Sequence, residues 1–526
     1  MQVAAEEIAD TPKLPVVPPS PAPPLLDSSE DGIERNAEAD TTGKEPAAAE
    51  AASGVWNGEA QPAVLSLEDV IFSVYRSYPK LEAALSDRGI AAGDQLAASG
   101  AFDLKIKGET RNQPLGYYET YRHAIGAVQP TMNGGNVYGG YRIGRGVFEP
   151  WYKERQTNEG GELKVGAEVP FARNRRIDER RAELLRTAYG RQLVDAEIQA
   201  QLIEFVQGAS YAWWMWVSAG RNYRIAERVL SLAEERTGRI RRQVEEQLVD
   251  PPVLTDNLRL VAERKAKLSE TSRKLQQSAI KLSLYLRDAE GRPLVAGPEL
   301  LPEFPDLLTR SQLDLEASVE RALSQRPELV AYELKRQQLQ VDQNEAANGL
   351  LPAIDGYVTG SQDMGEPTSK KRDKSEFELE AGLLLDVPLQ RRKARGKLMA
   401  VQAKLAQLAA KQRLMRDAIA ADVQSAIAAL LAAIEQVEQA REAVELAEEL
   451  ARRERRNFEL GASDLLKVTL REQYAAESAM KEVEAQLVFF LALADFRAAV
   501  GDDRMELDAM GVPCVPSVPP LCQLPK

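Results

Sequence analysis

The sequence predicts an α+β protein that consists mainly of long α-helices and is built from two internal repeats. Two observations carry this prediction. Residues 391–500 show helical periodicity over two long runs joined by a short turn. In addition, one order of elements (helix, strands, long helix, turn, helix) occurs twice along the chain. Ala, Glu, Leu, Arg and Gln dominate the composition, as is typical of long helices.

The longest helix is expected from Arg391 to Phe458. Its apolar positions step by three and four, starting with Leu398, Val401 and Leu405, and charged residues fill the other faces. At 1.5 Å per residue such a helix is roughly 100 Å long. A helix of this length needs a partner of similar length. The return helix after the turn at residues 460–464 and a matching pair earlier in the chain supply it.

The first repeat contains a helical block, strands with one apolar and one polar face, and a pair of long helices. Its expected elements are a helix at 65–99, a strand at 102–107, a Tyr- and Gly-rich stretch at 116–141, a strand at 162–169 and helices at 174–248 and 255–287, the last two separated by Pro251-Pro252.

The second repeat follows a Gly- and Pro-rich linker. Its opening echoes the first at a constant offset, since Leu313 corresponds to Leu65 and Arg326 to Tyr78, both 248 positions apart. Strands are expected at 353–358 and 376–385, and the long helices follow them. The predicted division is 1–62 (disordered Pro/Ala/acidic segment), 63–290 (first repeat), 291–310 (linker), 311–501 (second repeat) and 502–526 (Pro-rich tail).

Composition excludes several classes of function. A net charge of −13 without a dense basic patch argues against nucleic-acid binding. Residues 1–60 hold three Lys/Arg and twelve Asp/Glu and show no signal-peptide features or lipid-accepting cysteine. No run of 18 apolar residues occurs, so no membrane-spanning helix is expected.

Catalysis is not expected either. His123 is the sole histidine, and it is expected to be structural or to face a lumen. The two cysteines, Cys514 and Cys522, lie in the Pro-rich tail, where a disulfide and two free thiols are equally open. Without a nucleophile–base pair, metal-ligand spacing or phosphate loop, the sequence predicts no enzyme, cofactor or metal site.

The strands alternate apolar and polar residues, which suits a sheet with one dry and one wet face. In water this indicates a sandwich or a helix-covered sheet; in an outer membrane it indicates a barrel with lipid outside and a polar lumen. A chain with few strands cannot close a wide barrel, so the membrane interpretation requires several chains to pool their strands.

Both repeats carry the same short motifs. These are the Leu-x-Leu-Glu openings at 65–68 and 313–316, the Pro-x-Leu pairs at 79–81 and 327–329, and the Val-Pro strand ends at 169–170 and 387–388. Together with the repeat plan they resemble the outer-membrane efflux protein family, the TolC-like channels. Residues 457–468 resemble the turn between that family's last two long helices. The resemblance covers about 63–500.

The resemblance implies a homotrimer with four strands from each protomer in one 12-stranded outer-membrane β-barrel, continued by a periplasmic α-helical barrel. It implies a passive exit duct of a tripartite efflux or type I secretion system. The implied partners are outer-membrane lipid, a periplasmic adaptor (membrane fusion protein) and an inner-membrane pump of the RND or ABC type. The alternative is a coiled-coil scaffold or interaction protein of the cell envelope without a pore.

By the same resemblance, the tips of the helical barrel dock the adaptor and open like an iris. Some members narrow the tip with aspartates; Lys467 and Leu470 stand there in the second repeat, so an acidic ring is not expected. From the residues alone, Asp464 is expected to cap the return helix. The tip residues assigned to docking are Asp256, Gly461, Ser463, Asp464, Leu465 and Lys467.

Three further clusters have ordinary explanations. Residues 213–216 (WWMW) are expected to pack at the middle of the helical bundle. Glu234-Glu235 with Arg236 is expected to be a solvated helix face, and Lys370-Lys371-Arg372 a solvated loop. The additional residues 116–159 of the first repeat are expected to form added strand or an external loop.

Overall fold

A computed structural model describes residues 64–148, 156–308, 310–368 and 376–502. All of them belong to the second of the chain's two compact units, Ala60–Lys526. The predictions made for residues 1–62, for Lys370-Lys371-Arg372 and for Cys514 and Cys522 lie outside the described residues.

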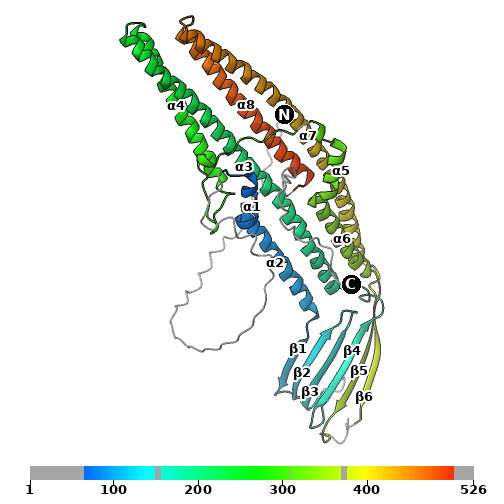
Figure 1. Ribbon diagram of the computed structural model, residues 1–526. Coiled ribbons are helices and arrows are strands. Elements are labelled where there is room, and N and C mark those ends of the chain that lie inside the picture. The colour runs from blue at the N-terminus through cyan, green and yellow to red at the C-terminus, as the bar shows by residue number, and fades with distance from the viewer. Residues whose placement is uncertain (1–63, 149–155, 309, 369–375, 503–526) are drawn as a thin grey trace, which may run out of the picture. The chain divides into compact units, whose positions relative to one another are not determined.

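Eight α-helices occur in the described part of the chain, in an order that repeats (Figure 1). Two short helices precede strands and two long helices follow them, first with α1 to α4 and then with α5 to α8. The helices are α1 (Leu67–Ser77), α2 (Pro79–Ser99), α3 (Glu179–Glu245), α4 (Pro251–Leu282), α5 (Leu315–Gln325), α6 (Pro327–Asn348), α7 (Arg392–Glu459) and α8 (Leu465–Val500).

Local chemistry sets the helix boundaries. Ser66 and Asp69 form a capping box at the start of α1. Pro79 and Pro327 stand at the first position of α2 and α6, where a missing N–H is tolerated. The same rule moves the expected start of the second long helix from residue 255 to residue 251: α3 ends before Pro251-Pro252, and these prolines are the first residues of α4.

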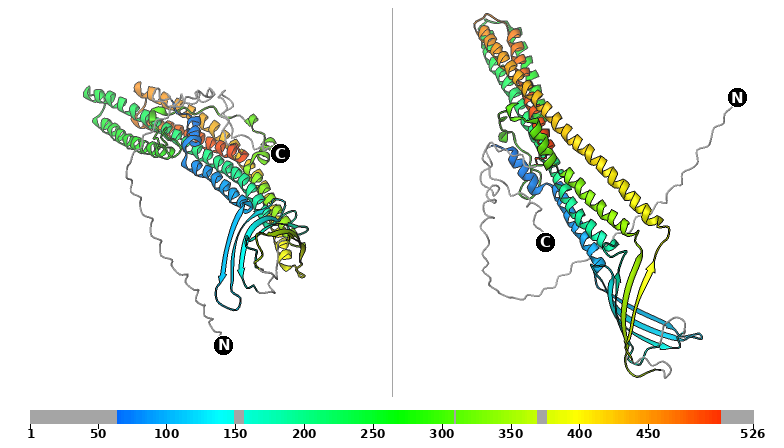
Figure 2. Two further views of the ribbon diagram at one scale, coloured as in Figure 1. Left: turned by 90° about the horizontal axis from the view of Figure 1, so that it is seen from below. Right: turned by 90° about the vertical axis from the view of Figure 1, so that its right-hand side faces the viewer.

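The long helices pack side by side in pairs, α3 with α4 and α7 with α8, and α3 also contacts α8 (Figures 1 and 2). Helices α3 and α7 have 67 and 68 residues. The main core contains Trp216, Phe489 and Leu430, all fully buried. Trp214 stacks on Phe490 with ring centroids 3.8 Å apart, and Trp213 and Trp216 are also buried, which confirms the predicted packing role for the three tryptophans; Met215 between them is 43% exposed.

Among the described helices, α7 alone has the length and composition to cross a membrane. Length and composition alone do not make α7 a membrane span, so the expectation that no helix crosses a membrane is not contradicted. Within the fold, Ile419, Val423 and Ile427 of α7 are buried in a cluster with residues of α5 and α8. The buried side of the apolar stretch therefore packs inside the bundle.

The strands form one antiparallel sheet in sequence order, β1-β2-β3-β4-β5-β6. This corrects the count of four strands per chain, because among the described residues the first repeat contributes four strands and the second two. The additional hairpin, β2–β3, accounts for most of the extra residues 116–159, of which 149–155 are outside the described ranges. The strands are β1 (Lys105–Gln113), β2 (Thr120–Pro130), β3 (Asn136–Gly146), β4 (Glu162–Pro170), β5 (Ala353–Asp363) and β6 (Glu378–Asp386).

The junction between sheet and helices is held by hydrogen bonds from both repeats. The backbone N–H of Phe171 donates to the carbonyl of Ile354 at 2.8 Å. The backbone N–H of Asn174 donates to the side chain of Asn348 at 2.8 Å. The strands therefore continue from the helices without a long linker, and Figure 2 shows them beyond the ends of α2, α3, α6 and α7.

Candidate functional site

The register of the sheet places most large apolar residues of the strands on one face, although Val128 and Leu384 lie on the other face and Arg145 lies among the apolar residues. Partners across an antiparallel pair share a face, and Tyr141 pairs with Leu163 while Ala167 pairs with Val358. Eleven large apolar side chains on this face are between 39% and 74% exposed. They are Ile106, Tyr121, Ile125, Val137, Leu163, Val165, Val169, Val358, Leu379, Leu383 and Leu385.

The opposite face is polar and is cross-linked between strands. Arg142 of β3 donates to Glu162 of β4 at 3.0 Å, and Tyr357 of β5 donates to Glu380 of β6 at 3.0 Å. Charged residues of this face occur on all six strands: Lys105, Lys107, Glu109, Arg111, Arg122, Arg142, Glu162, Lys164, Glu168, Asp355, Asp363, Glu378, Glu380 and Asp386.

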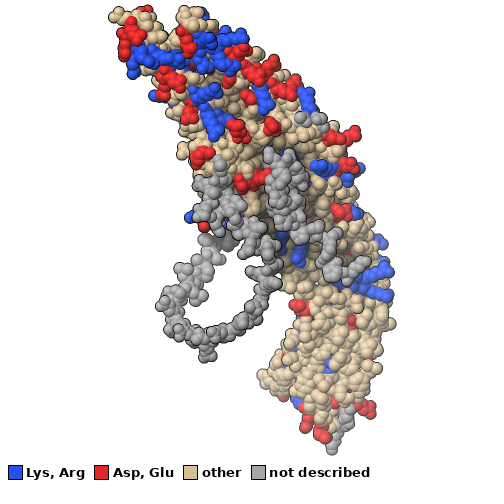
Figure 3. Space-filling view, viewed as in Figure 1, with Lys and Arg blue, Asp and Glu red and all other residues tan. Residues whose placement is uncertain are grey.

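An exposed apolar face of this extent is unusual in water. The strands have 9 or 11 residues, close to the length that crosses a bilayer when tilted. Figure 3 shows the sheet end of the molecule with few charged side chains away from its rim, whereas charges gather over the far halves of the helices. Within the described residues, β1 pairs only with β2 and β6 only with β5, so both edges are open.

His123 lies on β2 beside these apolar residues. Its register partner is Thr110, and its Nδ1 lies 3.3 Å from the Thr110 hydroxyl. It shares the face of Tyr121 and Ile125 and does not lie on the polar face. No group of three possible metal ligands occurs in the described ranges.

The turn between α7 and α8 has the geometry of a Schellman motif. Gly461 has a φ of +73°, and its N–H donates to the carbonyl of Phe458 at 3.0 Å. The N–H of Ala462 donates to the carbonyl of Asn457 at 2.8 Å. Ser463 donates a hydrogen bond to Glu454.

Asp464 caps α8, as its position in the sequence predicts. Its carboxylate accepts from the backbone N–H of Lys467 at 2.8 Å, and the Lys467 ammonium lies 3.3 Å from its other oxygen. The backbone bond and then the Lys467 charge hold the pKa of Asp464 below its ordinary value. Leu465, the first residue of α8, is half-buried.

The first repeat ends in a second tip at the same end of the helices (Figure 1). Arg239 of α3 pairs with Glu459 of α7 at 2.9 Å and joins the two tips. Asp256 is exposed in the second turn of α4. Large leucines are also exposed at the tips: Leu248, Leu460 and Leu466, between 68% and 73%.

A buried ion cluster behind the tips was missed from the sequence. Glu472 of α8 accepts from Arg236 of α3 and from Arg264 of α4, the latter at 3.1 Å, and Arg455 of α7 lies 3.7 Å away. The Arg236, Arg264 and Glu472 side chains are 6%, 9% and 3% exposed. The prediction that Arg236 belongs to a solvated face is therefore wrong.

The sequence contains a signal for this cluster, in the position of its charged residues relative to buried apolar ones. Arg236 stands between the buried Ala233 and Ile240, and Glu472 follows the buried Val468 by four, so both charges occupy the apolar stripe of their helix. Burial lowers the pKa of the Arg264 guanidinium, and the neighbouring Arg236 charge lowers it further. The Glu472 carboxylate raises this pKa but does not offset the effect of burial. The cluster ties all four long helices together near their tips.

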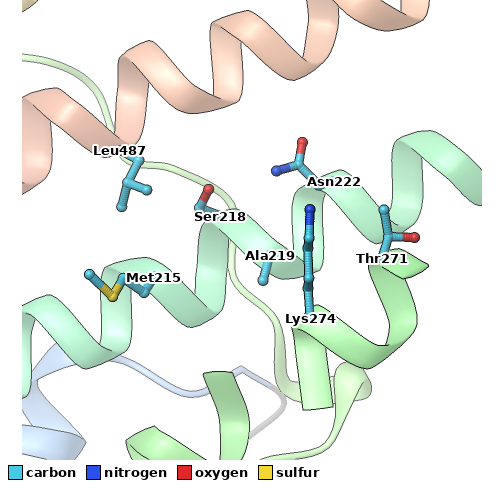
Figure 4. A pocket seen from close by; sticks show the side chains of 7 residues that line it. All are labelled: Met215, Ser218, Ala219, Asn222, Thr271, Lys274 and Leu487. Carbon is cyan, nitrogen blue, oxygen red and sulfur yellow. The ribbon is translucent and has the colours of Figure 1, made fainter. Parts of the chain in front are cut away.

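A small cavity lies farther from the tips, between α3, α4 and α8 (Figure 4). Its volume is about 150 Å³. Its lining mixes apolar side chains, such as Met215 and Leu487, with Asn222 and Lys274. This volume is below the roughly 300 Å³ at which small-molecule pockets begin, so it does not indicate a ligand site.

Comparisons with known proteins agree with the geometry. Residues 318–502, most of the second repeat, match the family described as outer membrane efflux protein. The resemblance inferred from the repeats is therefore confirmed. No curated protein sequence matches the chain.

Solved structures with this fold include outer-membrane channels. VceC of Vibrio cholerae has a TM-score of 0.56 at 14% identity, over 83% of this chain and 96% of that chain. MtrE of Neisseria gonorrhoeae, in its open state, has a TM-score of 0.56 at 16% identity, over 83% and 89%. A membrane protein of Pseudomonas aeruginosa has a TM-score of 0.58 at 15% identity, over 88% and 99%. At these identities the likeness concerns the fold.

Proposed function

We propose that this chain, whose residues 318–502 match the outer membrane efflux protein family, is an outer-membrane channel that serves as the exit duct of an efflux or secretion system. It acts as a homotrimer with its sheet in the outer membrane and its long helices in the periplasm. It conducts substrates passively from a periplasmic adaptor and an inner-membrane pump of the RND or ABC type. It is a transport protein and not an enzyme.

The exposed apolar face of the sheet is the observation that carries this proposal. Eleven large apolar side chains on six strands face outward without a covering element among the described residues. Each fully buried residue of this size is worth about 1.5–3 kcal/mol relative to exposure, so the face needs an apolar environment. Lipid supplies it, and the polar face then lines the lumen.

The open edges of the sheet support a multimer. In lipid every unpaired backbone N–H and C=O costs several kcal/mol, so an open sheet is not stable there. Pooling the strands of several chains closes the edges. Exposed apolar residues along α7, such as Met399, Leu414 and Leu446, provide further contact surface for neighbouring copies.

The helix tips are the proposed docking point of the adaptor. Leu248, Leu460 and Leu466 expose apolar area at both tips, next to the residues assigned from the resemblance. The two repeats at 63–290 and 311–501, with the linker between them, are proposed as the folding units that each supply one helical pair to the periplasmic wall. The buried Glu472 cluster holds the two pairs together until the tips separate.

Membrane fractionation and planar-bilayer recording test the proposal. The full chain is expected in the outer membrane, as a multimer that survives unheated gel electrophoresis and forms conducting pores. Val165→Lys places a charge on the apolar face and is expected to destabilise the inserted protein by about 2–4 kcal/mol near the bilayer midplane. Ser361→Lys, on the polar face, is the matched control and should insert normally.

The opposite outcome identifies the alternative. A soluble, monomeric chain without conductance, equally tolerant of both lysines, would leave the coiled-coil scaffold of the cell envelope as the better description.

A further inference from the structure

We propose that β1 of one chain pairs antiparallel with β6 of the next copy and that three copies close an 18-stranded barrel. In the proposed register, called flush here, Lys105 stands opposite Asp386 and the two strands overlap along their whole length. The proposal rests on the proposed function, which supplies the membrane and the three copies. It replaces the 12-stranded barrel implied by the resemblance, because the described part of the chain contains six strands. Its new content is the register, the residues that meet across the edge and the width of the pore.

The stagger within the sheet determines the register. Directly opposite residues lead from Lys105, the first residue of β1, across the sheet to Glu380 of β6. The intermediate partners are Val128, Tyr138, Gly166 and Thr359. Glu380 lies six residues before Asp386, the last residue of β6. The path therefore moves six residues away from the helix end of the strands over six strands.

A closed ring continues this stagger. When the helix-proximal strand ends of all copies lie at one level in the membrane, Asp386 of one copy stands opposite Lys105 of the next. The stagger is then one residue per strand, or 18 residues around 18 strands. With a rise of about 3.4 Å per residue and a spacing of about 4.8 Å between strands, the tilt is roughly 35°. This lies at the lower end of the 35–45° range of outer-membrane barrels.

Charge at the two edges favours the same register. The polar face of β1 carries Lys105, Lys107, Glu109 and Arg111, whereas that of β6 carries Glu378, Glu380 and Asp386. Flush pairing brings Lys105 opposite Asp386, Arg111 opposite Glu380, and Glu109 opposite the uncharged Gly382.

The neighbouring registers of β1 and β6 have less favourable side-chain pairing than the flush register. A shift of two residues in one direction pairs Arg111 with Glu378 but places Glu109 opposite Glu380, and like charges directly opposite are destabilising, so this register keeps one ion pair and adds one repulsion. The same shift in the other direction retains one ion pair, Lys107 with Asp386. A shift of one residue moves the apolar side chains of the neighbour to the polar face.

The pore is correspondingly wide. For 18 strands at this tilt the backbone-to-backbone diameter is roughly 34 Å, against roughly 23 Å for 12 strands. Barrels of 16–18 strands leave an aqueous channel. The hairpin β2–β3 therefore acts to enlarge the outer exit, and the narrow point of the duct falls in the helical part, at the tips.

Disulfide cross-linking in the outer membrane tests the register. In a Cys514→Ser/Cys522→Ser background, the pair Thr110→Cys and Ala381→Cys lies directly opposite in the flush register, at a distance that a disulfide spans. Within one chain these positions lie on the two edges of the sheet, five strand spacings or roughly 24 Å apart. Oxidation is therefore expected to give a ladder of linked chains that ends at a closed species of three.

Shifted pairs are the controls. Thr110→Cys with Leu379→Cys and Thr110→Cys with Leu383→Cys are displaced by two residues and should link at least tenfold more slowly. Each single cysteine variant alone should give no ladder. Arg111→Glu and Glu380→Arg should each weaken the heat resistance of the multimer on gels, and the two together should restore it.

The outcomes separate this inference from the proposed function. Faster linking of a shifted pair overturns the register, and a ladder that closes at two or four chains overturns the 18 strands. A conducting outer-membrane multimer without any link between positions 110 and 381 overturns the edge pairing and leaves the function standing. A soluble monomer without a ladder overturns both.

Discussion

Removing the charge of Glu472 should loosen the two helical pairs near their tips. Glu472 is the one acid among Arg236, Arg264 and Arg455, and its side chain is 3% exposed. In Glu472→Gln the two buried arginines lose their ionic partner. Removal of one partner of a buried ion pair typically costs 3–5 kcal/mol because a charge remains buried without compensation.

Hydrogen–deuterium exchange of the full chain measures this cost locally. If the cluster resists opening of the pairs, a loss of 3–5 kcal/mol speeds exchange by about 10² to 10³-fold or more. The acceleration should be confined to residues 230–245, 260–268 and 466–476. Glu448→Gln, in an exposed pair with Arg452, is the matched control and should leave exchange unchanged.

A second variant separates charge from packing. In R236M/R264M/E472M the cluster is replaced by apolar side chains, and such replacements are often neutral or stabilising. Arg455 is 36% exposed and can turn to water. Protection should therefore return to the level of the natural chain. The reasoning is refuted if Glu472→Gln exchanges within threefold of the natural chain, or if the triple variant is as unprotected as the single one.

The remaining predictions concern the α7–α8 tip. The pKa of Asp464 is lower in the fold than in the unfolded chain, where the ordinary value is 3.8. Its capping contribution is therefore present above about pH 4 and is lost as the pH falls through the folded pKa. Amide exchange at residues 465–468 should rise at that pH in the natural chain but not in Asp464→Asn, and an unchanged pH profile in both proteins would contradict the cap. Gly461→Ala should destabilise the turn by about 1–2 kcal/mol in chemical unfolding, because a φ of +73° disfavours a residue with a Cβ even though no atom lies within 4 Å of the added Cβ. Gly238→Ala, also in open space but inside α3, should stabilise the protein by about 0.5–1 kcal/mol. Equal effects of the two substitutions would refute the conformational argument. Lys467→Glu should shift the ion selectivity of the pore toward cations in planar bilayers, whereas Lys481→Glu, farther along α8, should not. If Lys467→Glu forms an intact channel of unchanged selectivity, Lys467 does not lie in the constriction.

The long helices, the α7–α8 turn and the strands β4 and β6 are the features that the sequence alone determined. Their signals are local: apolar steps of three and four in 391–458, a glycine at the position that needs a positive φ, and regular alternation along Leu163, Val165 and Ala167. Such patterns act over a few residues and do not depend on which elements meet later. The repeat added the order of elements, since each signal occurred twice.

The tertiary structure decided three things that these patterns could not. Strands β2 and β3 were seen only as a Tyr- and Gly-rich stretch, because glycines such as Gly126 and Gly140 interrupt the alternation and only pairing with β1 and β4 assigns their faces. Strand β1 begins at Lys105 rather than 102, because its polar sequence is fixed as a strand by β2. The Glu472 cluster joins residues up to 236 positions apart, and only the packing of α3 and α4 against α8 makes those charges buried.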